Sequence, residues 1–267
     1  MKKQYDYNLI IGAVLTVTML FLILLGCFYT PYDPDAMDSA AKFAGVSLKH
    51  LMGCDQFGRD IFSRVLVGLG TTFYVAFGTV CIGTFAGIIL GAVTGFFGGV
   101  VDEILMRITD ALFAIPSILL ALVVISLFGS GAWQVMLSLG IAFVPSFARI
   151  VRGEFLRLKD MDYVQSARLA GAGKMRIMFV HILPNMRAVL LSTIMIGFNN
   201  AVLAEAGLSF LGIGVQPPQS SLGRMLSEAQ GYIFSAPGCA LFPGIVLVLF
   251  VLGFVLLAEA FQERKTV

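Results

Sequence analysis

Long stretches without a charged residue recur along this chain, and they limit its fold more than any other feature. The first, residues 9–28, is long enough for a helix of about 1.5 Å rise per residue to cross the roughly 30 Å hydrocarbon core of a bilayer. Backbone N–H and C=O groups in lipid must be bonded within the protein, so such stretches form helices. Further spans are predicted at residues 77–97, 104–127, 133–147, 188–210 and 239–258, about six in all.

The composition agrees with a chain covered largely by lipid. Only 13% of the residues are charged and 58% are hydrophobic, whereas soluble domains carry about 25% charged residues. The net charge of +2 is too small for the basic surface of a nucleic-acid-binding protein. We therefore predict an all-α integral membrane protein that binds no nucleic acid.

The N-terminal region divides into three predicted parts. Lys2 and Lys3 precede the first uncharged stretch, which we interpret as a retained span because it is longer than the apolar region of a signal peptide. The uncharged stretch at residues 65–101 is too long for one span, so its first part, after Arg59, Asp60 and Arg64, is predicted to be an interfacial helix. The predicted domains are residues 1–71, residues 72–260 with a loop at 149–187, and a tail at 261–267.

The distribution of Lys and Arg predicts the orientation, because basic loops stay in the cytoplasm. With the N-terminus inside, thirteen basic residues lie on the cytoplasmic side and five lie outside. Both termini and the 149–187 loop are therefore predicted to be cytoplasmic. The inner group is Lys2, Lys3, Arg107, Arg149, Arg152, Arg157, Lys159, Arg168, Lys174, Arg176, Arg187, Arg264 and Lys265.

The cysteines and histidines do not form a recognisable metal site. Four cysteines are widely scattered without a C-x-x-C pair, and the chain has two histidines, His50 and His181. This spacing indicates neither a disulfide scaffold nor zinc binding. We interpret the cysteines as small packing residues and predict no metal site.

Glycine recurs at every fourth position of the second predicted span. On a helix this spacing forms a bare ridge on which another backbone can pack closely. Close helix contact is the first interpretation, and sliding of helices during a conformational cycle is the second. The ridge consists of Gly83, Gly87, Gly91, Gly95 and Gly99.

A few polar residues inside the predicted spans are candidates for a translocation path. Arg107 and Asp110 are three residues apart and can pair, or they can reach toward the cytoplasmic headgroups. Glu205 follows Asn199 and Asn200 within the fifth predicted span. A carboxylate in a span is a functional candidate, but Glu205 can equally pair locally. The path candidates are thus Asp110, Asn199, Asn200 and Glu205. Pro116 should bend the third span.

The 149–187 loop contains the pattern most typical of a docking element. From Asp162 it reads DYVQSARLAGAGKMRIMFVHILPN, which predicts an amphipathic helix, a Gly171-Ala172-Gly173 turn and a second helix ending at Leu183-Pro184. The small residues leave a surface that another protein can approach closely. A solvated cytoplasmic hairpin is the alternative.

This segment resembles the EAA loop of binding-protein-dependent ABC permeases. Asp162 stands for the usual Glu, Ser166-Ala167 for the Ala pair, Gly171 for the glycine, and residues 181–185 for the closing segment. The GCDQFGRDIFSR sequence at 53–64 and the EAGLSFLGIG sequence at 205–214 are similar to signatures of the oligopeptide, dipeptide and nickel importers, on the side of their C-type permease. The C-terminal residues 254–267 lack the family's usual ending.

The resemblance implies a type I ABC importer permease fold and a set of partners in the bacterial plasma membrane. These are a homologous second permease, two cytoplasmic ABC ATPases that bind ATP and Mg, and an extracytoplasmic solute-binding protein. The chain has no phosphate-binding loop of its own, so no enzymatic activity and no cofactor are expected. A bulky residue at Gly171 should uncouple ATP hydrolysis from uptake. The implied ATPase-coupling residues are Asp162, Tyr163, Ser166, Ala167, Arg168, Ala170, Gly171, Ala172, Gly173 and Lys174.

Two other classes remain as alternatives at this stage. A secondary transporter driven by an ion gradient would need charged networks within the membrane, and the sequence offers only Glu205 and the Arg107/Asp110 pair. A membrane enzyme would need clustered nucleophiles, bases or metal ligands. The sequence leaves the cargo open among peptides, glutathione-like molecules, nickel and metal chelates.

Overall fold

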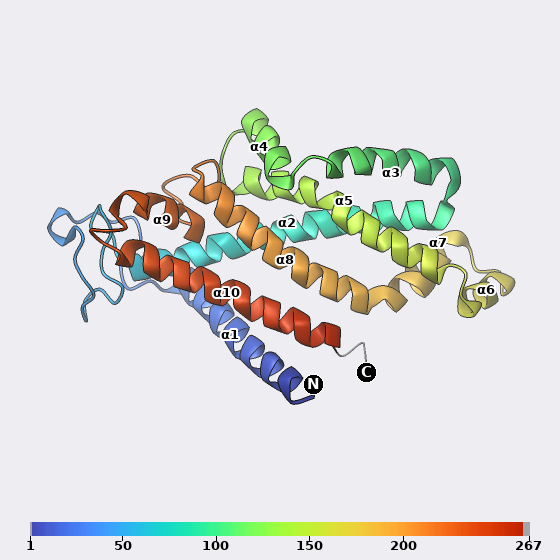
Figure 1. The fold of residues 1–267 in the computed structure, drawn as a ribbon, viewed down its shortest axis with the longest axis horizontal. Coiled ribbons are helices and arrows are strands. Elements are labelled where there is room, and N and C mark those ends of the chain that lie inside the picture. Colours follow the sequence, from blue (N-terminus) through green and yellow to red (C-terminus); the bar gives the residue numbers. More distant parts are fainter. Residues whose placement is uncertain (1, 264–267) are drawn as a thin grey trace.

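Helices and the loops between them make up residues 2–263, the part of the chain that the computed structural model describes (Figure 1). The α-helices are α1 (Lys2–Phe28), α2 (Ile61–Phe97), α3 (Gly99–Phe113), α4 (Ser117–Phe128), α5 (Ala132–Leu158), α6 (Asp162–Leu169), α7 (Lys174–Arg176), α8 (Arg187–Phe210), α9 (Leu222–Ala229) and α10 (Gly238–Glu263). Shorter helical turns are η1 (Ser39–Ala41), η2 (Ile177–Ile182), η3 (Leu183–Met186) and η4 (Gln230–Tyr232).

The long helices lie side by side along the long axis of the molecule (Figure 1). The short helix α6 lies at one end, and α9 with the loop that precedes α2 lies at the other. Helix α1 begins, and α10 ends, toward the end that carries α6. Five helices are long and apolar enough to cross a membrane, and the α3–α4 pair provides a sixth candidate. The predicted all-α membrane fold with about six spans is confirmed.

The third predicted span is broken rather than bent. Helices α3 and α4 meet at an angle of 89°, and Pro116 between them has an extended backbone with ψ of 131°. Proline cannot donate a backbone hydrogen bond, and it disfavours the helical conformation of the residue before it. The prediction of one helix over residues 104–127 was therefore wrong about its continuity.

Helix α2 is continuous over 37 residues, so the prediction of a separate interfacial helix before residue 77 was wrong. Its length is about 55 Å at 1.5 Å per residue, which carries its first turns beyond the hydrocarbon core. Arg64 in these turns has a side chain 2% exposed, and it pairs with Asp55 and Glu228. Because other protein segments neutralise this charge, the helix needs no break at the membrane surface. The predicted boundary at residues 71/72 lies inside α2.

Two boundaries of the 149–187 loop also differ from prediction. Its first residues form the last turns of α5, which ends at Leu158 rather than near Phe147. The second helix does not end at Leu183-Pro184, because residues 174–210 continue as one helical rod. Pro184 lies in the 3₁₀ turn η3, directly after the π turn η2. These two turns change the backbone hydrogen-bonding pattern where the proline lacks an N–H.

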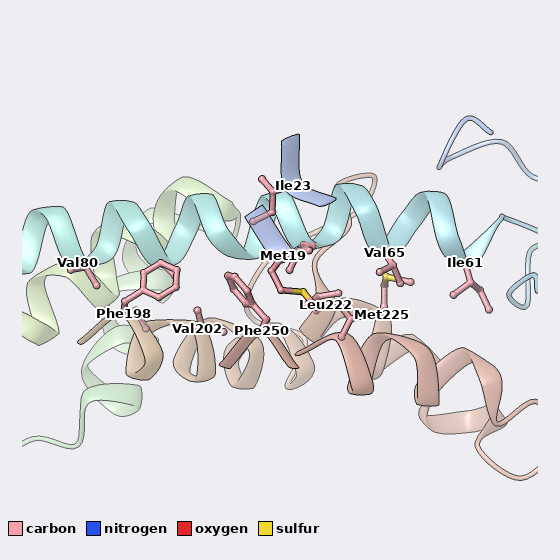
Figure 2. Close-up of a cluster of buried hydrophobic side chains, with 14 of the residues drawn as sticks. Met19, Ile23, Ile61, Val65, Val80, Phe198, Val202, Leu222, Met225 and Phe250 are labelled. Atoms are coloured by element: carbon pink, nitrogen blue, oxygen red, sulfur yellow. The ribbon is translucent and has the colours of Figure 1, made fainter. Parts of the chain in front are cut away.

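Apolar side chains from six helices, α1, α2, α5, α8, α9 and α10, form the largest core cluster (Figure 2). Met19 of α1, Val80 of α2, Phe198 of α8, Met225 of α9 and Phe250 of α10 meet there. A second cluster joins the end of α5 nearest α6 to α6 and η2. A third joins α2, α4, α5 and α8. The last residues of the predicted tail, 264–267, lie outside the described part of the chain.

Helices α2 and α5 are in close contact along the glycine ridge. A Cβ atom at Gly91 would lie 2.5 Å from the Ala148 carbonyl oxygen and 2.9 Å from the Arg152 nitrogen. Gly83, Gly87 and Gly95 also face α5 at distances that leave no room for a side chain. Gly99 is different, because it lies beyond α2 at the first turn of α3, and nothing lies within 4 Å of its Cβ position.

Candidate functional site

The short helix α6 projects from one end of the bundle as a small exposed element (Figure 1). Asp162 lies in its first turn and Arg168 in its last turn, which places each charge favourably on the helix dipole. Only residues 159–161 separate α6 from α5. Of the predicted coupling residues, Ala167 and Ala172 are partly covered, and the others are exposed: Asp162, Tyr163, Ser166, Arg168, Ala170, Gly171, Gly173 and Lys174.

Gly171 ends α6 through its backbone conformation. Its φ is +82°, a left-handed value that glycine adopts without steric cost. The Gly171 N–H donates to the Arg168 carbonyl, and the Ala172 N–H donates to the Ala167 carbonyl, both at 3.0 Å. These two bonds form a Schellman motif, which satisfies carbonyl groups at the end of a helix. Nothing lies within 4 Å of the Cβ position of either Gly171 or Gly173, so this chain leaves the volume around both residues open.

One side of α6 is anchored in the bundle. Val164 is 0% exposed and belongs to the cluster that contains Phe155 and Leu158 of α5 and Ile177 of η2. Burial of an aliphatic side chain of this size contributes about 1.5–3 kcal/mol. The α6 helix is thus attached to the last turns of α5 and to the start of the rod that leads to α8, so a force on α6 reaches both.

The most exposed apolar residue of α6 was not predicted from the sequence. Leu169, the last residue of α6, is 90% exposed, and Met175 nearby is 63% exposed. Leu169 borders the small residues Ala170 to Gly173, so it presents an apolar side chain on a surface that another protein can approach closely. The AGAG sequence that follows Leu169 could have indicated it, because a turn at that point leaves the last residue of the helix at the tip.

Ion pairs join α3 to α5 on the half of the molecule nearest α6. Nε and Nη2 of Arg152 donate to the two carboxylate oxygens of Asp102, each at 2.6 Å. Arg149 donates to Asp110 at 2.7 Å, and its guanidinium carbon lies 4.2 Å from the centre of the Phe113 ring. The predicted pairing of Arg107 with Asp110 was wrong. Arg107 pairs with Glu103 one turn earlier on α3, because Arg149 is placed to reach Asp110 from the neighbouring helix.

A cavity of about 570 Å³ opens between the α3–α4 break, α5 and α8. Apolar side chains form most of its wall. Its polar side chains are Ser117, Ser146, Thr193 and Asn200, and none of the described residues that line it is charged. Irregular backbone at membrane depth is tolerated where it lines a water-filled cavity, as residues 115–117 do here. This size matches that of pockets for small molecules.

The four path candidates do not meet at this cavity. Asn200 lines it, whereas Asp110 is paired with Arg149 and Asn199 is buried elsewhere, at 7% exposure. Glu205 is 0% exposed, and Oε1 of its carboxyl accepts a 2.7 Å hydrogen bond from the Ser209 hydroxyl. One oxygen of Glu205 thus pairs locally, whereas Oε2 is buried without a hydrogen-bond partner. Ser146 and Thr193 were missed, because single hydroxyl residues in apolar helices carry no distinctive spacing.

Beyond Glu205, hydrogen bonds connect the segments at the end opposite α6. The Ser209 hydroxyl accepts a bond from the Val215 N–H at 3.0 Å. The Thr72 hydroxyl of α2 accepts one from the Leu222 N–H at 3.3 Å. These contacts fix the loop between α8 and α9 against α2.

The end opposite α6 contains a network of charges, named here the outer ion network. Asp55, Arg59 and Arg64 are buried, and Arg224 and Glu228 are partly buried. Arg59 donates to Asp55 at 2.7 Å and to Glu228 at 2.9 Å. Arg64 donates to the same two carboxylates at 2.8 and 3.2 Å, and Arg224 lies 3.2 Å from Glu228. The network ties the loop before α2 to α9. The sequence signature at 53–64 contains Asp55, Arg59 and Arg64 of this network, but no pattern around Glu228 indicated that it is their partner.

No group of three or more His, Cys, Asp or Glu side chains that could hold a metal ion occurs among residues 2–263. Cys54 and Cys239, the two buried cysteines, are free thiols. A bundle of apolar helices with a broken span beside a cavity, and a short exposed helix attached to one span, agrees with the class of membrane transport subunits.

The chain belongs to the family of binding-protein-dependent transport system inner membrane components, whose model matches residues 83–267. The dipeptide transport system permease protein DppC of Haemophilus influenzae is 35% identical over 260 residues, covering 95% of this chain and 88% of that protein. The glutathione transport system permease protein GsiD of Pectobacterium atrosepticum is 39% identical over 255 residues, covering 95% and 85%. The resemblance to C-type ABC importer permeases is thereby confirmed.

The fold is shared with a solved ABC transporter. An inward-facing structure of the MetNI methionine transporter superposes with a TM-score of 0.62 at 19% identity, covering 76% of this chain and 95% of that one. Together these comparisons show a multi-pass inner-membrane permease subunit of an ATP-driven importer. They contradict the alternative of a secondary transporter driven by an ion gradient.

Proposed function

We propose that this chain is one of two homologous permeases of a peptide importer, and that two cytoplasmic ATPases drive it through α6. The observation that carries the proposal is the combination of exposure and attachment in one short helix. Leu169 is 90% exposed, whereas Val164 in the same helix is fully buried against α5 and η2. The exposed side suits a partner, and the buried side transmits its movement.

Hydrolysis of ATP belongs to the partners in this proposal, and they bind the nucleotide and Mg. Closure of the ATPase pair moves α6. Residues 159–161, which join α6 to α5, transmit the movement to α5. Packed helices respond by shifting as rigid bodies, which switches the bundle between outward- and inward-open states. Both chain termini and α6 lie in the cytoplasm in this proposal. The end with α9 and the outer ion network then faces the solute-binding protein.

Peptides are the cargo that the observations support best. The relatives that cover 95% of this chain are named for dipeptide and glutathione transport. The cavity beside the α3–α4 break carries hydroxyl and amide groups without a charged side chain, which suits the neutral amide groups of a peptide main chain. We propose that Asn200 belongs to the translocation path at this cavity. Nickel and metal chelates have no comparable support.

The docking of α6 is tested by replacing Leu169 with Asp in the complete transporter, copurified in detergent through a tag on this chain. Because Leu169 contacts little of its own chain, the variant should insert and fold normally. Loss of an apolar anchor at an interface typically weakens binding by about tenfold or more. We therefore expect most of the ATPase to be lost from the purified complex, and ATP-driven uptake of labelled di- and tripeptides in proteoliposomes to fall accordingly.

The matched control is Leu48→Asp, because Leu48 is also fully exposed, at 101%, but lies at the opposite end of the molecule. It should retain the ATPases at the wild-type level. Equal retention by the Leu169 variant, or wild-type transport without any ATPase, would contradict the proposed function.

A further inference from the structure

Helix α3 has an unusual attachment to the bundle. All of its residues are described, and Thr109 is the only one of them that is buried. A helix of 15 residues with a single buried side chain gains little from apolar packing. Its side-chain links to α5 are instead polar: Asp102 to Arg152, Asp110 to Arg149, and the Arg149 guanidinium over the Phe113 ring.

The two ion pairs join α3 and α5 at two separate positions along the helices. Asp102 and Asp110 are about 12 Å apart along α3, and their partners Arg152 and Arg149 lie in the opposite order on α5. Two attachment points hold the direction of a rod as well as its position. The Asp102–Arg152 pair is bidentate, with two bonds of 2.6 Å, which fixes the geometry more closely than a single contact can.

Stability alone does not explain the exposed pair. The side chains of Arg149 and Asp110 are 46% and 59% exposed, and ion pairs of this exposure contribute only about 0–1 kcal/mol. Their location is more informative. Arg149 contacts Phe113, the last residue of α3 and part of the cavity wall, and α5 continues from Arg149 to the joint with α6.

We propose that the two pairs make α3 follow α5, so that a movement of α6 reaches the α3–α4 break and changes the cavity on that side. Asp102, Asp110, Arg149 and Arg152 are then positioning residues for transport. The proposal rests on the proposed function, because it assumes that an ATPase moves α6. Without the pairs, α5 still moves, but α3 and α4 do not move with it.

The test reverses one charge at a time and then both. Asp102→Arg and Arg152→Asp are compared as single variants and as the double variant, in which the ion pair is restored with opposite polarity. Coupling between distant sites typically amounts to a factor of about 5–150. We expect each single variant to raise the number of ATP molecules hydrolysed per peptide transported by about tenfold. The double variant should return toward the wild-type ratio.

The structure offers a matched control on the same helix. Glu103 and Arg107 form an ion pair at 2.7 Å within α3, with side chains 62% and 78% exposed, and it does not cross to α5. Reversing Arg107 to Asp changes the net charge by the same amount as Arg152→Asp and should leave the ratio of hydrolysis to transport unchanged. A shift of this ratio in the control as large as that in Arg152→Asp would overturn the proposal.

A second readout does not depend on the cargo. Spin labels at Val123 of α4 and Val248 of α10, both exposed, report the position of α4 relative to the rest of the bundle. In the assembled transporter their distance should change when ATP is trapped on a hydrolysis-deficient ATPase. Arg152→Asp should abolish this change, with Arg152→Gln as the milder variant if reversal prevents folding. If either variant shows the same distance change as the wild type, the inference is wrong. If the ATPase does not bind α6 at all, the proposed function itself is wrong.

Discussion

At the scale of single residues, Cys54 shows how the loop before α2 lowers the reactivity of a thiol. It is 2% exposed, and burial, followed by the negative charges of Asp60 and Asp55, raises the pKa of its thiol to about 11 from an ordinary value of 9.0. Because both causes disfavour the thiolate, Cys54 stays protonated and unreactive at neutral pH.

This pKa predicts the pH dependence of thiol labelling. In a variant that retains Cys54 alone, the rate of maleimide labelling should rise about tenfold per pH unit from pH 8 to 10, because the thiolate fraction does so below the pKa. Labelling kinetics of the intact protein, measured by mass spectrometry, provide the check. Exposed Cys27, retained alone, serves as the reference for access. A plateau for Cys54 near pH 9 would contradict the raised pKa.

The end of α6 could be predicted from the sequence, and most of the residues that line the cavity could not. Gly171 follows a helix and precedes small residues, so local spacing alone indicates a helix end. Asn200 was predicted, but Ser146 and Thr193 join it only through the packing of α5 beside α8. Glu205 was ambiguous, because its hydrogen-bond partner Ser209 lies one turn away on the same helix and that pairing has no sequence signature.

At the scale of helices, the α2–α5 contact depends on the absence of side chains. Gly87, Gly91 and Gly95 allow the α5 backbone to approach α2. The close approach adds dispersion contacts between the helices, which drive helix association in a membrane. The ridge thus selects α5 as the neighbour of α2 along most of its length.

This contact predicts opposite effects for two alanine substitutions within α2. Gly91→Ala places a methyl group 2.5 Å from the Ala148 carbonyl oxygen, so the helices must separate at a cost of about 1–3 kcal/mol. Gly70→Ala meets nothing within 4 Å and should leave the stability unchanged or raise it, because alanine favours the helix. Thermal unfolding of the purified permease distinguishes them. Equal midpoints for the two variants would show that the ridge does not hold the helices together.

Helix boundaries were predictable only where the local sequence decides them. Pro116 and the Gly129–Gly131 turn marked both ends of α4. The continuity of α2 depends instead on Glu228, which neutralises Arg64 from 164 positions away. The passage of the 174–210 rod through Pro184 likewise depends on backbone adjustments that have no sequence signature.

At the scale of the whole molecule, the two ends differ in kind. One end carries α6 with its exposed apolar tip, and the other carries a largely enclosed network of three guanidinium groups and two carboxylates. The basic residues concentrate toward the α6 end, which agrees with the expectation that it lies in the cytoplasm.

This asymmetry predicts the topology in cells. A cysteine introduced at exposed Lys174, after replacement of Cys27 and Cys81, should resist a membrane-impermeant maleimide added to intact cells and should react once the membrane is opened. A cysteine at exposed Leu48 should react from outside in both cases. Labelling of the Lys174→Cys variant in intact cells would reverse the orientation and remove the basis of the docking proposal.

The outer ion network also has a consequence for biogenesis. Asp55, Arg59 and Arg64 are synthesised early, but Glu228 is added more than 160 residues later. Until it arrives, two arginines share a single carboxylate in a region destined to be enclosed, and an uncompensated enclosed charge is costly. The N-terminal half therefore reaches its full set of charge pairs only after α9 has been synthesised.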